Sequence, residues 1–168
     1  MTSECPGCHA RLPHSDGPTH GYIGASSACW IMYSNLLGGS PPLPATNNAP
    51  LLVDAFAAQH PGGSSPQATQ SVAIHLLTLF AILERGHDVA QAVLLRTTGV
   101  EVKRLSGHGY PKLLPVPDGW AVTISDIATA DEADRGGLVD DYVNDVLQRW
   151  QDLHAGLIEE WYRGTQPG

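Results

Sequence analysis

Apolar positions along the chain recur mostly at helical spacing. The middle of residues 66–85 is apolar almost all round, which predicts a central, buried helix. Strand-like alternation is weak, with its clearest trace at residues 120–124. Near the C-terminus, apolar side chains recur every three or four residues, as on one face of a helix. They are Val139, Val143, Val146, Trp150, Leu153, Leu157 and Trp161.

Residues that commonly begin or end helices set the limits of the predicted helices. Ser26 can cap a helix over residues 27–37, which the two glycines that follow would end. Ser65 precedes a proline suited to the first helical position, so the next long helix is expected over residues 66–85. Shorter helices are predicted over residues 51–59, 88–97 and 124–130.

Glycine and proline concentrate in one long segment, residues 99–123, which predicts an ordered loop that could lie across a pocket. The 168 residues are enough for one hydrophobic core and too few for two ordinary domains. We therefore predict a mainly α, compact single-domain helical bundle. Its parts are an N-terminal metal-binding arm (1–22), the first helices (23–98), the loop (99–123) and the C-terminal helices (124–164).

Charge and composition limit the classes of partner. Seventeen acidic residues against nine basic ones give a net charge of −8, which would repel a phosphate backbone, so no nucleic-acid partner is expected. The longest apolar run, residues 72–83, is interrupted and too short for a bilayer of ~30 Å, so no membrane partner is expected. Without a recognisable leader, and with only three cysteines, the chain is expected in the cytoplasm.

A CPGC motif near the N-terminus indicates metal binding. Cys5 and Cys8 are separated by Pro-Gly, a turn that can bring both sulfurs to the same side. Thiolates at this spacing are typical zinc ligands, so Zn²⁺ is the expected cofactor. The alternative is that Cys5 and Cys8 are two small residues in a flexible tail.

The two remaining ligands are expected among His20, Cys29, His60, His75 and His154. His60 and His75 are the first choice, because a histidine at a helix exit and one inside the next helix converge when the two helices pack antiparallel. An unpaired buried imidazole costs roughly 1–3 kcal/mol, so His75 requires a partner, either the metal or a neighbour such as Asp54. Asp54 could also orient a ligating imidazole.

Three residues are candidates for catalysis. Cys29 lies in the first turn of its predicted helix, where the helix dipole favours a thiolate nucleophile. His20 could serve as its base or as a metal ligand, and His154 beside the C-terminal stripe could transfer protons. The alternatives are packing roles for Cys29 and His154.

Several motifs resemble those of an uncharacterised bacterial family, a domain of unknown function frequent in actinobacteria. They are CPGC at 5–8, GPTHGYIGASSACW at 17–30, VDAFAAQHPG at 53–62, QSVAIHLLTLFAILERG at 70–86 and W-x-x-x-H at 150–154. The resemblance covers most of the chain, implies that the metal and the histidines belong together, and carries no activity. Ser27 and Phe56 depart from the pattern, which often has proline and tyrosine there.

These residues support two candidate functions, a scaffold protein with a structural metal and a metal-dependent enzyme. In the first, Cys5, Cys8, His60 and His75 close a structural zinc that links the N-terminal arm to the bundle of a binding or scaffold protein. In the second, the zinc keeps an open position and assists hydrolysis or lyase chemistry on a small molecule bound in the bundle interior. A zinc-ribbon transcription module would need a second CxxC pair and a basic face, which this sequence lacks.

Overall fold

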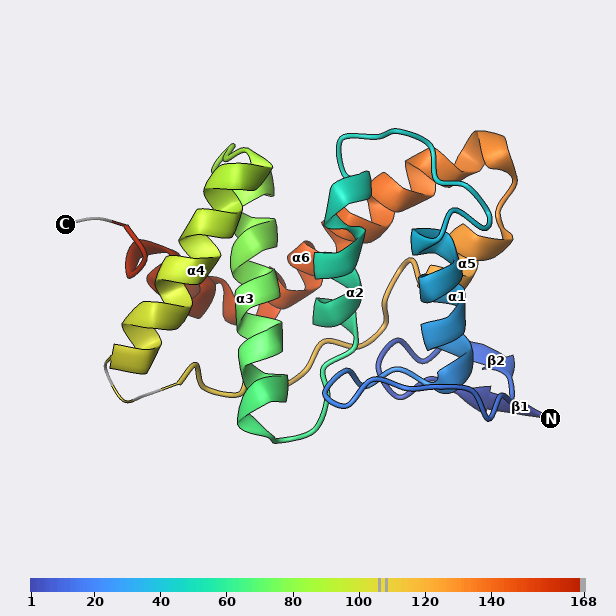
Figure 1. Ribbon diagram of the computed structural model, residues 1–168, viewed down its shortest axis with the longest axis horizontal. Coiled ribbons are helices and arrows are strands. Elements are labelled where there is room, and N and C mark those ends of the chain that lie inside the picture. The colour runs from blue at the N-terminus through green and yellow to red at the C-terminus, as the bar shows by residue number, and fades with distance from the viewer. Residues whose placement is uncertain (106, 108, 167–168) are drawn as a thin grey trace.

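The computed structural model describes residues 1–105, 107 and 109–166 and is mainly helical, which confirms the predicted fold class. Four helices lie side by side, with α4 and α1 at the two ends of the row (Figure 1). They are α1 (Ser27–Leu37), α2 (Leu52–Gln59), α3 (Pro66–Leu83) and α4 (Val89–Leu105). A single 3₁₀ turn, η1 (Ala49–Leu51), leads into α2.

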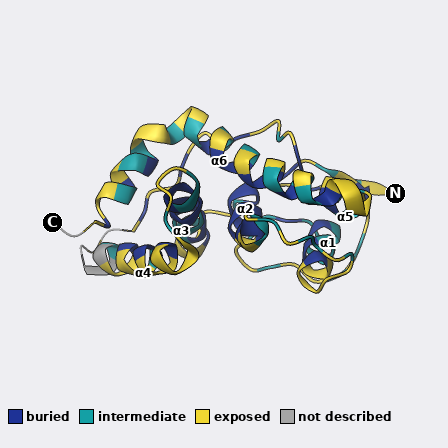
Figure 2. Ribbon diagram, turned by 90° about the horizontal axis from the view of Figure 1, so that it is seen from above, coloured by how far each residue is buried: buried dark blue, intermediate teal, exposed yellow. Residues whose placement is uncertain are grey.

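Two further helices form a second layer. The short α5 (Ile124–Thr129) packs against α1, and the long α6 (Glu132–Arg163) crosses behind the row and packs against α2 and α3. Buried residues lie on the sides of these helices that face one another (Figure 2). The core is therefore the space between α6 and the row of four helices.

Helix α3 is the central element of the core. It packs against α2, α4 and α6, and ten of its residues are buried. Its length and composition alone would also suit a membrane span. A helix that packs against three other helices in this way is typical of the core of a globular fold.

Both predicted serine caps are present. The side-chain oxygen of Ser26 accepts a hydrogen bond from the backbone N–H of Cys29, and that of Ser65 accepts one from Ala68. Each cap satisfies a donor that the first helical turn leaves unpaired. The starts of α1 and α3 are therefore where the sequence predicted them.

Helix α4 extends beyond its predicted end. It continues through Gly99 to Leu105, whereas a loop was expected from residue 99. The structure gives Gly99 a packing reason, because a Cβ there would lie 2.6 Å from the hydroxyl oxygen of Tyr110. Residues 106 and 108 of the predicted loop lie outside the described residues.

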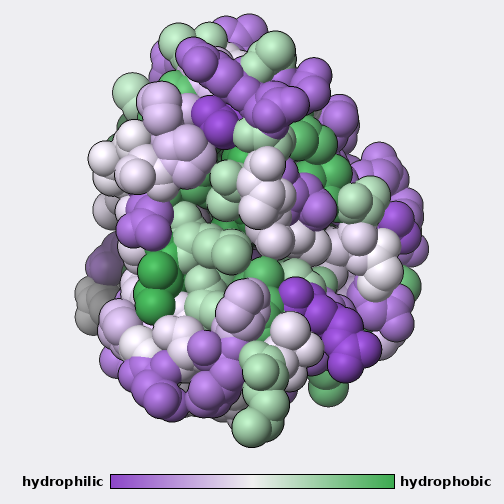
Figure 3. Space-filling model, turned by 90° about the vertical axis from the view of Figure 1, so that its right-hand side faces the viewer, coloured by the Kyte–Doolittle hydropathy of each residue, from purple (hydrophilic) through white to green (hydrophobic). Residues whose placement is uncertain are grey.

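A short antiparallel hairpin was not predicted. Strands β1 (Thr2–Glu4) and β2 (Arg11–Pro13) pair with Ser3 opposite Leu12. Three-residue strands are too short to show alternation in the sequence. The strand-like residues 120–124 instead lead into α5, whose first turn is closed by a capping box between Thr123 and Asp126. Figure 3 looks at the end of the molecule that carries the hairpin, where hydrophilic and hydrophobic groups are mixed.

A substitution of Trp150 tests whether α6 packs against the row of four helices. Trp150 is buried in α6, and its Nε1 donates a hydrogen bond to the carbonyl oxygen of Ala58 in α2 at 3.0 Å. Trp150→Phe leaves that carbonyl unpaired and opens a cavity, so the free energy of unfolding should fall by about 2–4 kcal/mol in urea denaturation. The control is Leu153→Ala, at a side chain of the same helix that is 46% exposed. Equal losses in the two variants would contradict the described packing.

Candidate metal centre

Four buried donor groups meet at the turn of the N-terminal hairpin. Cys5, Cys8, Cys29 and His60 place one ligand atom each within 4.8 Å of all the others. The Sγ atoms of Cys8 and Cys29 are 3.9 Å apart, and Cys29 Sγ is 3.3 Å from His60 Nε2. We call these four residues the Cys3His group, which could hold a metal ion.

The hairpin positions the first two sulfurs. The chain turns between β1 and β2, and the turn is closed by backbone hydrogen bonds from Cys5 N–H to Ala10 and from His9 N–H to the Cys5 carbonyl, each 2.9 Å long. His9 has a positive φ of 62°, an uncommon conformation for a residue with a side chain. This tight turn brings Cys5 and Cys8 to the same side.

Gly7 allows the hairpin to approach α2. A Cβ at this position would lie 2.6 Å from Cδ2 and 2.7 Å from Cα of His60. Real side chains do not tolerate such distances from backbone atoms, so only glycine fits. The CPGC turn therefore rests directly on His60.

His60 is aimed at the sulfurs by its position at the end of α2. The helix stops there because Pro61 follows, and His60 has non-helical angles (φ −117°, ψ 62°). Its Nδ1 donates a hydrogen bond to the Phe56 carbonyl oxygen at 2.8 Å. A carbonyl accepts only, so Nδ1 carries the proton and Nε2 is left with a lone pair for a ligand.

The segment before α1 joins these parts. The backbone N–H of Gly24 donates to the His60 carbonyl at 2.9 Å, and Ile23 forms a β-bridge with Pro61. Two residues further on, the backbone N–H of Ser26 donates to Cys5 Sγ at 3.3 Å. Cys29 then enters the group from the first turn of α1, where Ser26 caps the helix.

The loop between α4 and α5 also reaches the hairpin. The indole Nε1 of Trp120 donates to the carbonyl oxygen of Gly7 at 3.0 Å. This bond joins the loop to the middle of the CPGC turn. The loop therefore helps to hold the turn in place.

Three thiols in one buried space perturb one another. The hydrogen bond with Cys29 holds the pKa of Cys5 well below its usual value, with Cys8 adding a smaller effect in the same direction. Hydrogen bonds to Cys5 and Cys8, together with burial, raise the pKa of Cys29. The protein alone thus favours one thiolate, and three thiolates together require a nearby cation.

The predicted metal ligands are brought together in part. Cys5, Cys8 and His60 belong to the Cys3His group, and the fourth donor is Cys29 where His75 was expected. His75 has a different partner, since its Nδ1 lies 2.7 Å from Asp54 Oδ1. Asp54 therefore orients His75, and not an imidazole of the Cys3His group. The carboxylate that the sequence offered as the alternative partner of His75 is the one that the structure supplies.

The predicted catalytic residues have three different surroundings. Cys29 has no exposed surface and contacts the other donors of the Cys3His group. His20 lies against the rings of Tyr22 and Trp30, and its buried Nδ1 has no partner among the described residues. His154 lies at a kink in α6, where its Nε2 is 2.8 Å from the Pro115 carbonyl oxygen. These contacts do not assemble the three residues around one reacting centre.

The fold and the site together define a small helical protein with a buried group of three cysteines and one histidine. The model of a family of unknown function, DUF5946, matches residues 3–151, so the chain belongs to this family. The match includes all four donors and ends within α6. No curated protein and no solved structure matches the chain. The resemblance to an uncharacterised family is thereby confirmed.

Gly7→Ala tests the contact between the hairpin and α2. The added Cβ must displace His60, so the variant should lose about 1–3 kcal/mol of stability, seen as a lower thermal midpoint. Gly21→Ala is the matched control, because a Cβ at Gly21 would meet nothing within 4 Å. If both variants unfold at the wild-type temperature, the close approach of Gly7 to His60 is wrong.

Proposed function

We propose that the Cys3His group binds one Zn²⁺ and that this ion is structural, fastening the N-terminal hairpin to α1 and α2. The observation that carries the proposal is the convergence of four soft or imidazole donors from three separate parts of the chain. Three cysteines and one histidine are a common closed ligand set for zinc.

The donor spacing supports an ion of this size. Zinc binds sulfur at about 2.3 Å and imidazole nitrogen at about 2.0–2.1 Å, so a tetrahedral site separates two sulfurs by ~3.8 Å and sulfur from nitrogen by ~3.6 Å. The corresponding separations are 3.9 Å between Cys8 and Cys29 and 3.3 Å between Cys29 and His60. Little movement is needed to accommodate the ion.

Four protein donors favour a structural role over a catalytic one. Catalytic zinc sites usually have three protein ligands and one water, and a hydrolase or lyase built here would have to give up one of the four donors. The donors are also almost completely buried, with Cys8 the most exposed at 4%. A structural thiolate site of this kind is suited to a reducing compartment such as the cytoplasm.

Elemental analysis of the purified protein should find one zinc per chain. Replacing Cys5, Cys8 or Cys29 with serine, or His60 with alanine, should release the zinc and lower the thermal midpoint by on the order of 10 °C, because metal binding and folding are coupled. A strong chelator should have the same effect on the wild type.

His75→Asn is the matched control, since this histidine is bound to Asp54 and its asparagine replacement can still donate to that carboxylate. The variant should keep its full zinc content. Zinc retained in Cys29→Ser and lost in His75→Asn would show that the ligand set is wrong.

A further inference from the structure

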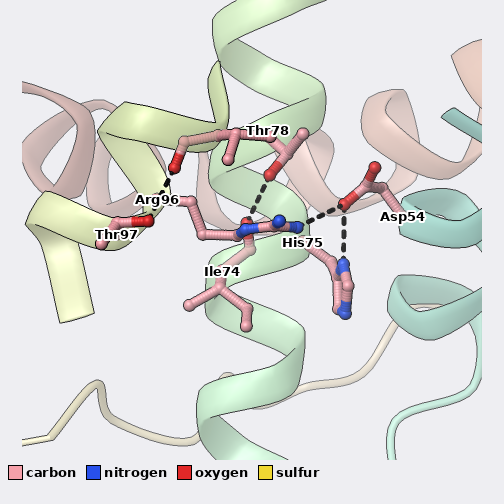
Figure 4. A network of polar contacts seen from close by, with 7 residues as sticks. Asp54, Ile74, His75, Thr78, Arg96 and Thr97 are labelled. Carbon is pink, nitrogen blue, oxygen red and sulfur yellow. Dashed lines mark hydrogen bonds and ion pairs between the residues drawn. The ribbon is translucent and has the colours of Figure 1, made fainter. Parts of the chain in front are cut away.

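A second group of polar side chains connects three helices. Figure 4 shows Asp54 of α2, His75 of α3 and Arg96 of α4 meeting at one carboxylate. His75 Nδ1 is 2.7 Å from Asp54 Oδ1, and Arg96 Nη1 is 3.7 Å from the same oxygen. The side chains of His75 and Arg96 thus lie beside the same oxygen of Asp54.

Asp54 fixes the orientation of the imidazole. The carboxylate accepts from Nδ1–H, so Nδ1 carries a proton and Nε2 is the ring nitrogen left for another partner. Nε2 has no hydrogen bond among the described residues, and it is not among the buried polar atoms that lack a partner, so it reaches solvent. The His75 side chain as a whole is 15% exposed.

Arg96 retains most of its donors. A guanidinium has five N–H groups, and the contact with Asp54 at 3.7 Å is longer than a hydrogen bond. The side chain is 31% exposed, and its other N–H groups have no partner within the described part of the chain. The neighbouring hydroxyls do not compete for a ligand, since Thr78 donates to the Ile74 carbonyl and Thr97 to the Val93 carbonyl (Figure 4).

We propose that His75 and Arg96 bind the oxyanion of a small molecule, either a carboxylate or a phosphate group. Asp54 acts as the positioning residue that holds both side chains. Guanidinium and imidazolium N–H groups are strong donors to such oxyanions, and Arg96 can bind one through two parallel hydrogen bonds. In the imidazolium form His75 carries an N–H on Nε2 as well as the one that Nδ1 gives to Asp54, so Nε2 can donate to the oxyanion beside the Arg96 guanidinium.

A purely structural connection between the helices would not require all three of Asp54, His75 and Arg96. The bond between His75 and Asp54 alone would join α2 to α3 and satisfy the buried carboxylate, whose side chain is 10% exposed. Arg96 adds a third helix while its side chain stays 31% exposed. Unused donors beside an accessible ring nitrogen are the features that point to a ligand.

The test is a titration of the full-length, metal-loaded protein followed by NMR of backbone amides in α2, α3 and α4. Inorganic phosphate and acetate are the two probes, and sodium chloride at equal ionic strength is the reference. We expect saturable shifts centred on Asp54, His75 and Arg96 with at least one probe. Saturation with phosphate alone assigns a phosphate ligand, and saturation with acetate alone assigns a carboxylate ligand.

Two variants remove the ligand contacts and preserve the fold. His75→Asn keeps a donor to Asp54 and loses Nε2, and Arg96→Gln removes the guanidinium. Each should weaken anion binding by about tenfold, the effect of losing one charge-assisted hydrogen bond. Arg149→Gln is the matched control, because Arg149 pairs with Asp145 on its own helix at 3.1 Å.

Zinc content and thermal midpoint are measured in every sample, so that loss of the metal centre is distinguished from loss of anion binding. The absence of saturable shifts up to about 50 mM of either probe, far above a useful affinity, would overturn the proposal. Binding that survives both His75→Asn and Arg96→Gln, or that falls equally in Arg149→Gln, would overturn it as well. Asp54, His75 and Arg96 would then be only a connection between helices.

Discussion

The convergence of three thiols and one imidazole in a buried space is the constraint on which the N-terminal half of the protein depends. Cys5 and Cys8 come from the hairpin, Cys29 from the first turn of α1, and His60 from the end of α2. Their mutual effects on pKa favour one thiolate and disfavour three, so all three could be thiolates together only around a cation. The close contact of Gly7 with His60 and the hydrogen bond from Trp120 to Gly7 both lead to this same place.

The helical part of the fold could be predicted because its signals are local. Ser26 and Ser65 cap their helices, and Pro61 ends α2 at His60, each through an interaction within a few residues. The hairpin and the continuation of α4 through Gly99 were missed because they depend on distant contacts. Gly99 normally argues for a break, but here its missing side chain makes room for Tyr110.

The sequence predicted part of the candidate metal centre, but not its full ligand set. The CPGC spacing pointed to Cys5 and Cys8, and the helix exit pointed to His60. For the fourth position the sequence offered His20, Cys29, His75 and His154, with His75 preferred, and no local pattern specifies that the face of α3 carrying His75 meets Asp54. A third thiol in a chain with only three cysteines was a signal that could have favoured Cys29, but the sequence-based prediction did not use it. His75 did have the partner that a buried imidazole requires, but the partner is a carboxylate.

X-ray absorption at the zinc edge of the purified protein tests the proposed metal centre most directly. We expect a spectrum that fits three sulfur ligands at about 2.3 Å and one nitrogen ligand at about 2.0 Å. Two sulfurs with two nitrogen or oxygen ligands, or protein that binds no zinc after preparation with the metal present, would contradict the Cys3His centre.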